Sequence, residues 1–262
     1  MATVQTIVDY VLGLAGHPLY HDEGVLYGAA ERAVDRLTVC WMATAEALEE
    51  AGNAGSDLIV THESLFYPIG AVPEAGATHD WEAWRTNRQR MRILDSSGAT
   101  LLRVHMTLDE ICVFDGFADL LELGAPVEVD GLAKVYEIAP CSLEHLIARV
   151  KQRVGLTTLR VCAPKGLDQI VHRVGLPWGG LGLSVNVLYQ HFLIEKGCDV
   201  FIAGEGDNYG ARFAGELGIP TIETDHEVSE QPGLRRFAEM LRKEFPQVTV
   251  LFHECRRAWQ TI

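Results

Sequence analysis

Short apolar runs alternate with helical patterns along the chain, and this alternation constrains the fold more than any other feature. The clearest run is DLIVT at residues 57–61, a continuous apolar stretch typical of a strand covered on both faces. Strand patterns at 37–43, 57–61 and 100–105 alternate with helix patterns at 45–54, 80–96 and 114–123. Such a series predicts an α/β fold with a mostly parallel sheet and helices on both faces.

A second α/β series follows a predicted linker at residues 125–131. It has strand patterns at 133–139, 159–163, 172–176, 199–203, 221–224 and 248–252, and helix patterns at 142–154, 186–196, 209–217 and 233–244. We therefore expect two α/β domains, residues 1–125 and 126–262, with the last helix and strand able to pack back on the first domain. The stretches 51–64 and 195–206 share one pattern, which favours two related domains, although most βα units look alike.

The overall charge argues against one class of function. The chain has 262 residues with 22 Lys and Arg against 36 Asp and Glu, a net charge of −14. Phosphate backbones attract basic surfaces, so this acidic charge argues against nucleic acid as a partner. The surplus of acids supports solubility, and it is also compatible with an acidic cleft that concentrates cations.

The cysteines and the N-terminus indicate a reducing compartment. None of the six cysteines forms a C-x-x-C pair, so we expect free buried thiols and no thiolate metal site. The first 14 residues lack the basic region of a signal peptide and read as an amphipathic helix. No uncharged apolar stretch reaches about 18 residues, which predicts a cytoplasmic protein without a membrane span.

Histidines and carboxylates recur where three predicted strands end. His62 and Glu63 follow the strand at 57–61, and His105 ends the strand at 100–105, four residues before Asp109. His226 follows the strand at 221–224, four residues before Glu230. Ligands of open α/β sheets bind at the carboxyl ends of strands, and imidazole with carboxylate suits zinc, manganese or iron.

Each of these residues also has a structural interpretation. A single histidine near a strand end is more often a hydrogen-bonded packing residue, and Asp109 could simply start the helix at 114–123. His226 and Glu230 would share one face of a helical turn, but Pro232 predicts that any helix there is short. Spacing alone therefore leaves a metal site and a purely structural role both open.

Two glycine-rich loops raise the alternative of a nucleotide site without metal. Residues 178–182 follow a predicted strand, and residues 204–210 lie between a strand and a helix. The second loop approximates a dinucleotide fingerprint, but its last gap is one residue too long and it carries Glu205 and Asp207. Tight backbone turns are the better interpretation, and the chain has no G-x-S-x-G nucleophile motif.

Several motifs, in order along nearly the whole chain, resemble one known family. DLIVTHESLFYP at 57–68 is similar to the DLIITHHPLFF motif of the NGG-one-interacting factor three family, which also carries the name GTP cyclohydrolase 1 type 2. HMTLDE at 105–110 resembles its HTNLD motif, and TDHEVSE at 224–230 resembles its GHxxxE motif. EGVLYG at 23–28 and CDVFIAGEGDNYG at 198–210 resemble two further segments.

The resemblance implies two α/β domains facing a central cleft with a pair of divalent metal ions, commonly in a ring-shaped homohexamer. Carried over residue by residue, the metal ligands fall on His62, Glu63, Asp109, His226 and Glu230. His105 then lies in or beside the site, and His105 or Glu205 could orient a ligand or transfer a proton in catalysis.

Departures from the family pattern keep two functions open. Glu63 replaces the second histidine of the family motif, Thr107 replaces the asparagine of HTNLD, and Met42 and Tyr209 stand where many members have aspartate and histidine. One hypothesis is a metal-dependent hydrolase of unknown substrate, acting on a phosphoester, an amide or a purine ring. The alternative is a metal-binding or scaffold protein without catalytic activity.

Overall fold

The computed structural model describes residues 1–68 and 80–260, which form two compact units. The first unit contains residues 1–113 and 233–255, and the second contains residues 114–232 and the C-terminal tail from residue 256. Most of the glycine- and proline-rich loop expected at 63–79, together with His79, lies outside the described residues. Within the described ranges, no helix combines the length and apolarity needed to cross a bilayer.

A five-stranded mixed sheet forms the centre of the first unit, in the order β1-β4-β3-β2-β11. Its strands are β1 (Gly24–Tyr27), β2 (Arg36–Cys40), β3 (Leu58–Thr61), β4 (Thr100–Arg103) and β11 (Thr249–His253). All neighbouring pairs are parallel except β1 with β4. Every residue of β3 and β4 is buried, as expected for strands covered on both faces.

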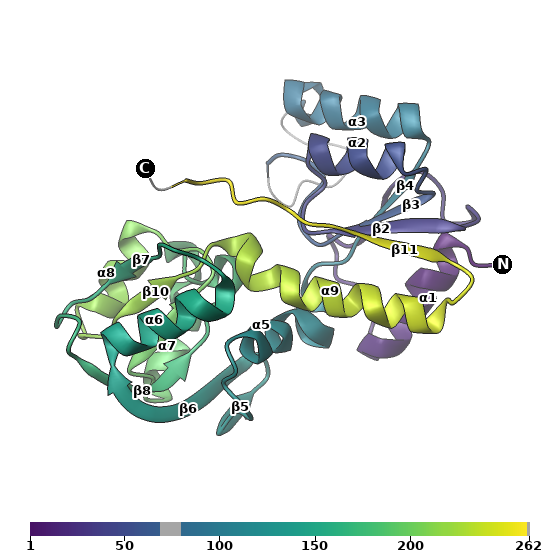
Figure 1. The fold of residues 1–262 in the computed structure, drawn as a ribbon. Helices are drawn as coiled ribbons and strands as arrows, with labels where there is room; N and C mark the ends of the chain where they lie inside the picture. Colours follow the sequence, from purple (N-terminus) through teal and green to yellow (C-terminus); the bar gives the residue numbers. More distant parts are fainter. Residues whose placement is uncertain (69–79, 261–262) are drawn as a thin grey trace. The chain divides into compact units, whose positions relative to one another are not determined.

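Helices cover both faces of this sheet (Figure 1). The helices α2 (Ala45–Asn53) and α3 (Arg85–Ser97) lie side by side on one face, and α1 (Val4–Ala15) lies on the other with residues 233–244. A short 3-10 helix, η1 (Trp81–Ala83), precedes α3. Thr44 caps α2 through its side chain and Gly98 ends α3 in a left-handed conformation, both as the sequence predicts.

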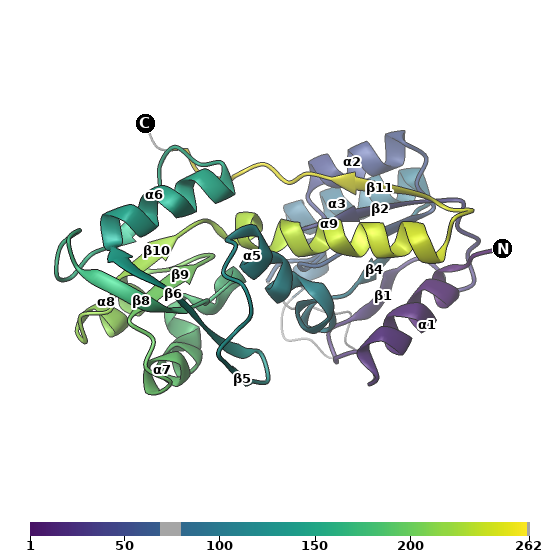
Figure 2. The ribbon, with the colours of Figure 1, turned by 60° about the horizontal axis from the view of Figure 1, so that its bottom comes forward.

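The second unit contains a six-stranded mixed sheet in the order β5-β6-β8-β9-β10-β7. Its strands are β5 (Glu128–Asp130), β6 (Ala133–Ser142), β7 (Arg160–Cys162), β8 (Ile170–Gly175), β9 (Val200–Ala203) and β10 (Thr221–Glu223). Only β8–β9 and β9–β10 are parallel. Among its helices, α6 (Leu143–Val154) lies on one face, and α7 (Val187–Glu195) and α8 (Asn208–Gly215) lie on the other (Figure 2).

The segment around Asp109 differs from the prediction. A helix was expected only from residue 114, but helical structure begins at α4 (Met106–Leu108) and continues through the π-helical turn η2 (Asp109–Val113) into α5 (Phe114–Leu120). Asp109 therefore lies on a helical turn and not in a connecting loop. Its neighbours Leu108, Cys112 and Val113 are fully buried, and this packing stabilises the turn.

The prediction that Pro232 would keep the helix after His226 short was wrong. A single helix, α9 (His226–Glu244), runs through Pro232, and the boundary between the two units falls directly after this proline. A proline inside a helix removes one backbone hydrogen bond and crowds the preceding turn. The buried side chains of Leu234, Phe237 and Leu241 in the following turns stabilise the helix beyond it.

Candidate metal-binding residues in each unit

His62 and Glu63 lie where β3 ends and the chain turns. The backbone N–H of Glu63 donates to the carbonyl of Trp41 at 2.7 Å, which prevents β3 from continuing as a regular strand. The guanidinium of Arg103 donates to the carbonyl of His62 at 3.2 Å. Adjacent residues in a strand point to opposite faces, so this turn allows the two side chains to converge.

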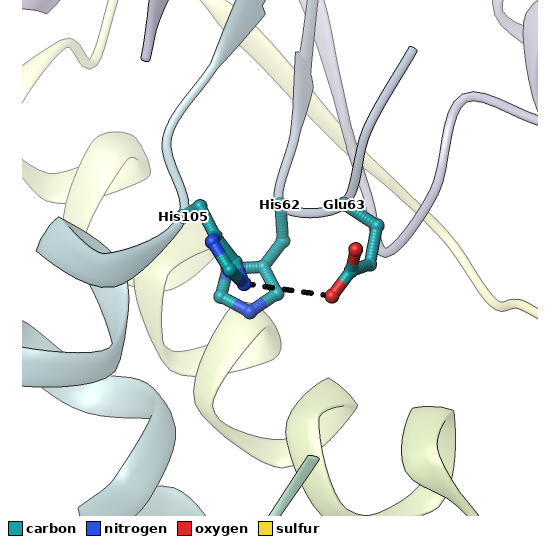
Figure 3. Close-up of side chains that lie close together, drawn as sticks. All are labelled: His62, Glu63 and His105. Atoms are coloured by element: carbon teal, nitrogen blue, oxygen red, sulfur yellow. Dashed lines mark ion pairs between the residues drawn. The ribbon is translucent and has the colours of Figure 1, made fainter. Parts of the chain in front are cut away.

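Four side chains of the first unit gather in one place. His105 Nε2 lies 3.6 Å from Glu63 Oε1, and His62 Nε2 lies 3.8 Å from Asp109 Oδ1. The rings of His62 and His105 meet edge to face with their centroids 4.8 Å apart. Figure 3 shows His62, Glu63 and His105 pointing toward one another, and each offers a ligand atom within 4.8 Å of the others.

The distances in this cluster fit ligands of one metal ion. Two atoms that each lie about 2.1 Å from a metal are roughly 3.0 to 3.6 Å apart in tetrahedral or octahedral geometry. The distances of 3.6 Å and 3.8 Å are at or slightly beyond this range, so small side-chain shifts would close the geometry. Glu63 and Asp109 are 4% and 5% exposed, and a divalent cation would offset the cost of burying these carboxylates.

The hydrogen bond of His62 determines which ring nitrogen can bind metal. Its Nδ1 lies 3.2 Å from the carbonyl oxygen of Val104, which can only accept a hydrogen bond. In the neutral ring the proton therefore resides on Nδ1, and Nε2 carries the lone pair on the side facing Asp109. Carbonyl groups commonly orient metal-binding histidines in this way.

Glu23 positions the segment that carries His105 and Asp109, and the sequence did not predict this role. Its carboxylate accepts hydrogen bonds from the backbone N–H groups of His105 at 2.6 Å and Thr107 at 2.9 Å. It also accepts from the Thr107 hydroxyl at 2.5 Å. The motif EGVLYG signalled a matching segment, but nothing in it showed that this glutamate caps a turn more than 80 residues away.

In the second unit, His226 lies between two carboxylates. His226 Nδ1 is 3.1 Å from Glu205 Oε2, and Nε2 is 3.2 Å from Glu230 Oε1. The second distance fits two ligands of one metal, while Glu205 can accept the Nδ1 proton and fix the ring. Burial raises the pKa values of the nearby Glu223 and Glu227 carboxyls.

The glycine-rich loops pack behind this pair. Gly179 has a φ of +51°, and a side chain there would overlap the Glu230 carboxylate and come within 3.1 Å of His226 Nε2. Its N–H donates to Ser229 Oγ at 2.9 Å. A Cβ on Gly204 would lie 2.5 Å from that same Ser229 oxygen. The glycines are therefore explained by close backbone approach, as the sequence favours.

The loop at 204–210 does not present an open helix N-terminus to a phosphate. Asp207 caps α8 and accepts hydrogen bonds from the N–H groups of Gly210 at 2.7 Å and Tyr209 at 3.0 Å. The N–H of Gly210, the Ser184 hydroxyl and two further N–H groups hold the pKa of Asp207 below its usual range. A carboxylate thus occupies the position at which a pyrophosphate would bind.

Met42 and Tyr209, which differ from the residues common in the resembled family, contribute no side chain to either cluster. Tyr209 is 78% exposed, and Met42 Sδ lies 3.9 Å from both the Tyr67 hydroxyl and an Arg90 nitrogen. All six cysteines are free thiols, but only Cys40, Cys112 and Cys198 are buried, and the other three are half-buried. Burial raises the pKa of Cys40 to about 12, so this thiol is a packing group. Among the described residues, the candidate ligands in both units are therefore histidines and carboxylates.

Family membership follows from comparison with known proteins. The family model described as Duf34/NIF3 (NGG1p interacting factor 3) matches residues 2–258, and the chain belongs to this family. The NIF3 homolog of Schizosaccharomyces pombe is 29% identical over 109 residues, which cover 41% of this chain and 36% of that protein. A GTP cyclohydrolase 1 type 2 homolog of Clostridium acetobutylicum is 23% identical over 230 residues, 82% of this chain and 79% of that protein.

Solved structures share the fold. A Bacillus cereus protein related to NIF3 superposes with a TM-score of 0.80 at 15% identity, covering 100% of this chain and 99% of that chain. The α/β architecture predicted from the alternation of strands and helices is thereby confirmed, and both of its sheets are mixed.

Proposed function

We propose that this chain binds a pair of divalent metal ions and acts as a metal-dependent hydrolase on a small-molecule substrate. The observation that carries the proposal is the convergence of His62, Glu63 and His105 at distances suited to one ion. His62 and Glu63, with Asp109 from the same unit and His226 and Glu230 from the second unit, form the proposed ligand set, and His105 lies beside it. Family membership supports this set, since the motifs that contain these residues match those of the family.

The surrounding residues have distinct proposed roles. A bound divalent ion would supply Lewis acidity, which activates water and stabilises negative charge on a substrate oxygen. Glu205 accepts the Nδ1 proton of His226 and so holds the ring with Nε2 toward Glu230. His105 can hold or release a proton at Nε2, which faces the Glu63 carboxylate.

The proposal names a class of substrate, a set of suitable metals and an expected assembly. A phosphoester, an amide or a purine ring each suits hydrolysis by activated water, and relatives carry the name GTP cyclohydrolase 1 type 2 homolog. Zinc, manganese and iron each suit a site of imidazole and carboxylate. A ring-shaped homohexamer is the expected assembly, which light scattering on the purified protein would test.

Elemental analysis of the purified protein tests the proposal. We expect about two metal ions per chain in the wild type after loading with zinc, manganese or iron(II), and fewer in Asp109→Ala and His226→Ala. Asp119→Ala, an aspartate outside the proposed ligand set, is the matched control and should keep the wild-type content. Absence of metal in the loaded wild type would overturn the proposal.

A second function is favoured by Glu63. A carboxylate in place of the family histidine adds a negative charge, which changes metal preference and can remove catalytic activity while metal binding persists. A broad hydrolase screen on metal-loaded protein separates the two. Turnover that a chelator abolishes, and that Asp109→Ala loses, supports the hydrolase; metal binding with no turnover supports a non-enzymatic metal-binding or scaffold protein.

A further inference from the structure

The C-terminal tail of the second unit contacts the turn that leads into α9. From this geometry we propose that the tail is a strap that positions His226, with Arg257 as its principal positioning residue. The inference rests on the proposed function in one respect only, that His226 is a metal ligand. The tail itself carried no signal in the sequence, and no role follows for it from the ligand motifs.

The turn before His226 is conformationally strained. Asp225 has a φ of +78°, one of only two non-glycine residues with positive φ in the described part of the chain. Its carbonyl accepts the N–H of Ser229 at 3.2 Å, so α9 begins directly on this residue. A non-glycine residue keeps such a conformation only when surrounding contacts hold it there.

The tail supplies those contacts on both sides of His226. The Arg257 guanidinium pairs with the Asp225 carboxylate through Nε, and the Ala258 N–H donates to Glu227 Oε1 at 3.3 Å. The side chain of Asp225 is 12% exposed and that of Arg257 is 31% exposed, so solvent screens this ion pair only in part. The residues before and after His226 are therefore both tied to the tail.

The ring of His226 is held separately from its backbone. Glu205 fixes the ring through Nδ1, and the Ser229 hydroxyl donates to the His226 carbonyl at 2.7 Å. The Glu205 contact determines how the ring turns, whereas the strap, together with the Ser229 hydrogen bond to the backbone carbonyl, determines where its Cα lies. Loss of the strap would let the strained turn relax, which would change the 3.2 Å separation between His226 Nε2 and Glu230 Oε1.

The test compares Arg257→Ala with two matched variants. Arg257→Lys retains a positive charge that can reach Asp225. Arg153→Ala removes an arginine of similar exposure that pairs with Glu122 and not with the turn. Zinc affinity is measured by chelator competition, and the ¹H–¹³C signal of the His226 ring is followed by NMR in metal-free protein. Far-UV circular dichroism and thermal melting check that each variant is folded.

We expect Arg257→Ala to weaken zinc binding about tenfold, as removal of a group that supports a metal ligand commonly does. It should also shift the His226 ring signal without metal. Arg257→Lys should recover most of both properties, and Arg153→Ala should change neither. Wild-type affinity together with an unchanged His226 signal in folded Arg257→Ala would overturn the inference.

Two further measurements apply if Arg257→Ala does not fold or if the wild-type protein binds no metal. If Arg257→Ala does not fold, Asp225→Asn replaces it, because asparagine tolerates positive φ and removes only the charge of the pair. If wild-type protein binds neither zinc, manganese nor iron(II), the proposed function fails. The metal-free NMR signal still tests the strap: a shift in Arg257→Ala supports it, and no shift overturns it.

Discussion

Glu23 makes three hydrogen bonds to the segment that carries His105 and Asp109, although it is not itself a proposed ligand. Its carboxylate accepts hydrogen bonds from the N–H groups of His105 and Thr107 and from the Thr107 hydroxyl, and Thr107 lies two residues before Asp109. Hydrogen bonds to a charged acceptor in a part-buried setting are among the stronger ones. The positions of His105 and Asp109 should therefore depend on this one side chain.

We expect Glu23→Ala to lower the free energy of unfolding by about 2 kcal/mol, since three groups lose a charged acceptor. Zinc affinity should fall about tenfold because the turn carrying Asp109 loosens. Urea unfolding and chelator competition measure the two effects. Glu31→Ala, at an exposed glutamate of the same unit, serves as the control. Unchanged zinc affinity in Glu23→Ala would show that the turn is held by packing alone.

Glu63 determines the metal preference if it is a ligand. Replacing it with histidine exchanges a carboxylate oxygen for an imidazole nitrogen, which favours zinc over manganese. We expect Glu63→His to raise the ratio of zinc to manganese affinity by about tenfold. Competition titrations with both metals measure this ratio. An unchanged ratio, with both metals still bound, would mean that Glu63 lies beside the ions and does not ligate them.

Among the helical elements, α9 approaches η2 closely at one glycine. A Cβ on Gly233 would overlap the Cα of Val113 and lie 2.6 Å from the carbonyl oxygen of Cys112. These are backbone atoms, so relief requires movement of the π-helical turn that carries Asp109. The glycine therefore permits the contact that supports one candidate ligand.

Gly233→Ala should destabilise the first unit by about 1–3 kcal/mol through overpacking. It should also weaken metal binding, because η2 must shift. Thermal unfolding and zinc titration test both expectations. Gly13→Ala offers a control on α1, where an added Cβ meets nothing within 4 Å. A Gly233→Ala protein with wild-type stability would contradict the close approach of these two helices.

The N-cap of α8 predicts a dependence of stability on pH. Hydrogen bonds to the Asp207 carboxylate lower its pKa in the folded state. A lowered folded-state pKa means that the carboxylate stabilises the fold above the unfolded value of about 3.9, and that this contribution is lost as pH falls through the folded-state pKa. The stabilising contribution of Asp207 is therefore fully present at neutral pH.

Asp207→Ala should cost about 1 kcal/mol at pH 7, in the range of N-cap replacements. Asp207→Asn retains a capping group without charge and separates the two effects. We expect the stability difference between wild type and Asp207→Asn to shrink as pH falls below about 4. Urea unfolding at several pH values measures this difference. A difference that stays constant down to pH 2 would contradict the pKa lowering.

Local patterns predict the elements whose signals are local. The cap at Thr44, the stop at Gly98 and the buried strand β3 all follow from neighbouring residues. The edge strands β1 and β5 were missed because their own sequences show weak alternation. β1 forms by pairing with the distant β4, and β5 is a three-residue arm of a hairpin with β6. The prediction of a short helix at Pro232 was wrong because tertiary packing outweighs one lost hydrogen bond.

In the candidate site, too, the sequence predicts some residues and not others. Strand ends and family motifs indicate His62, Glu63, His105 and His226, and the structure brings the first three of these together. Residues that support the candidate ligands, such as Glu23 and Arg257, are polar side chains with no motif of their own. Their roles depend on contacts between segments far apart in the sequence, which periodicity does not report.

At the scale of the whole molecule, the chain passes between its two units several times. It leaves the first unit after Val113, returns at Gly233 and leaves again after Cys255. β11 then adds a parallel edge strand beside β2, so the first unit is complete only when the C-terminal part has been made. Both units thus depend on sequence from the last 30 residues, and neither corresponds to one continuous stretch of chain.

Metal binding should therefore be visible in the stability of the full chain. A metal that binds only the folded state stabilises it by about 2.7 kcal/mol when free metal is 100 times the dissociation constant. We expect zinc to raise the unfolding midpoint of wild-type protein and a chelator to reverse this. If the ions need ligands from both units, Asp109→Ala and His226→Ala should each lose most of the zinc-dependent gain. If each cluster bound metal independently, each single variant would keep a substantial part of the gain, and their effects would add. Urea unfolding with and without zinc, on both variants and the double variant, decides between a shared centre and two separate sites.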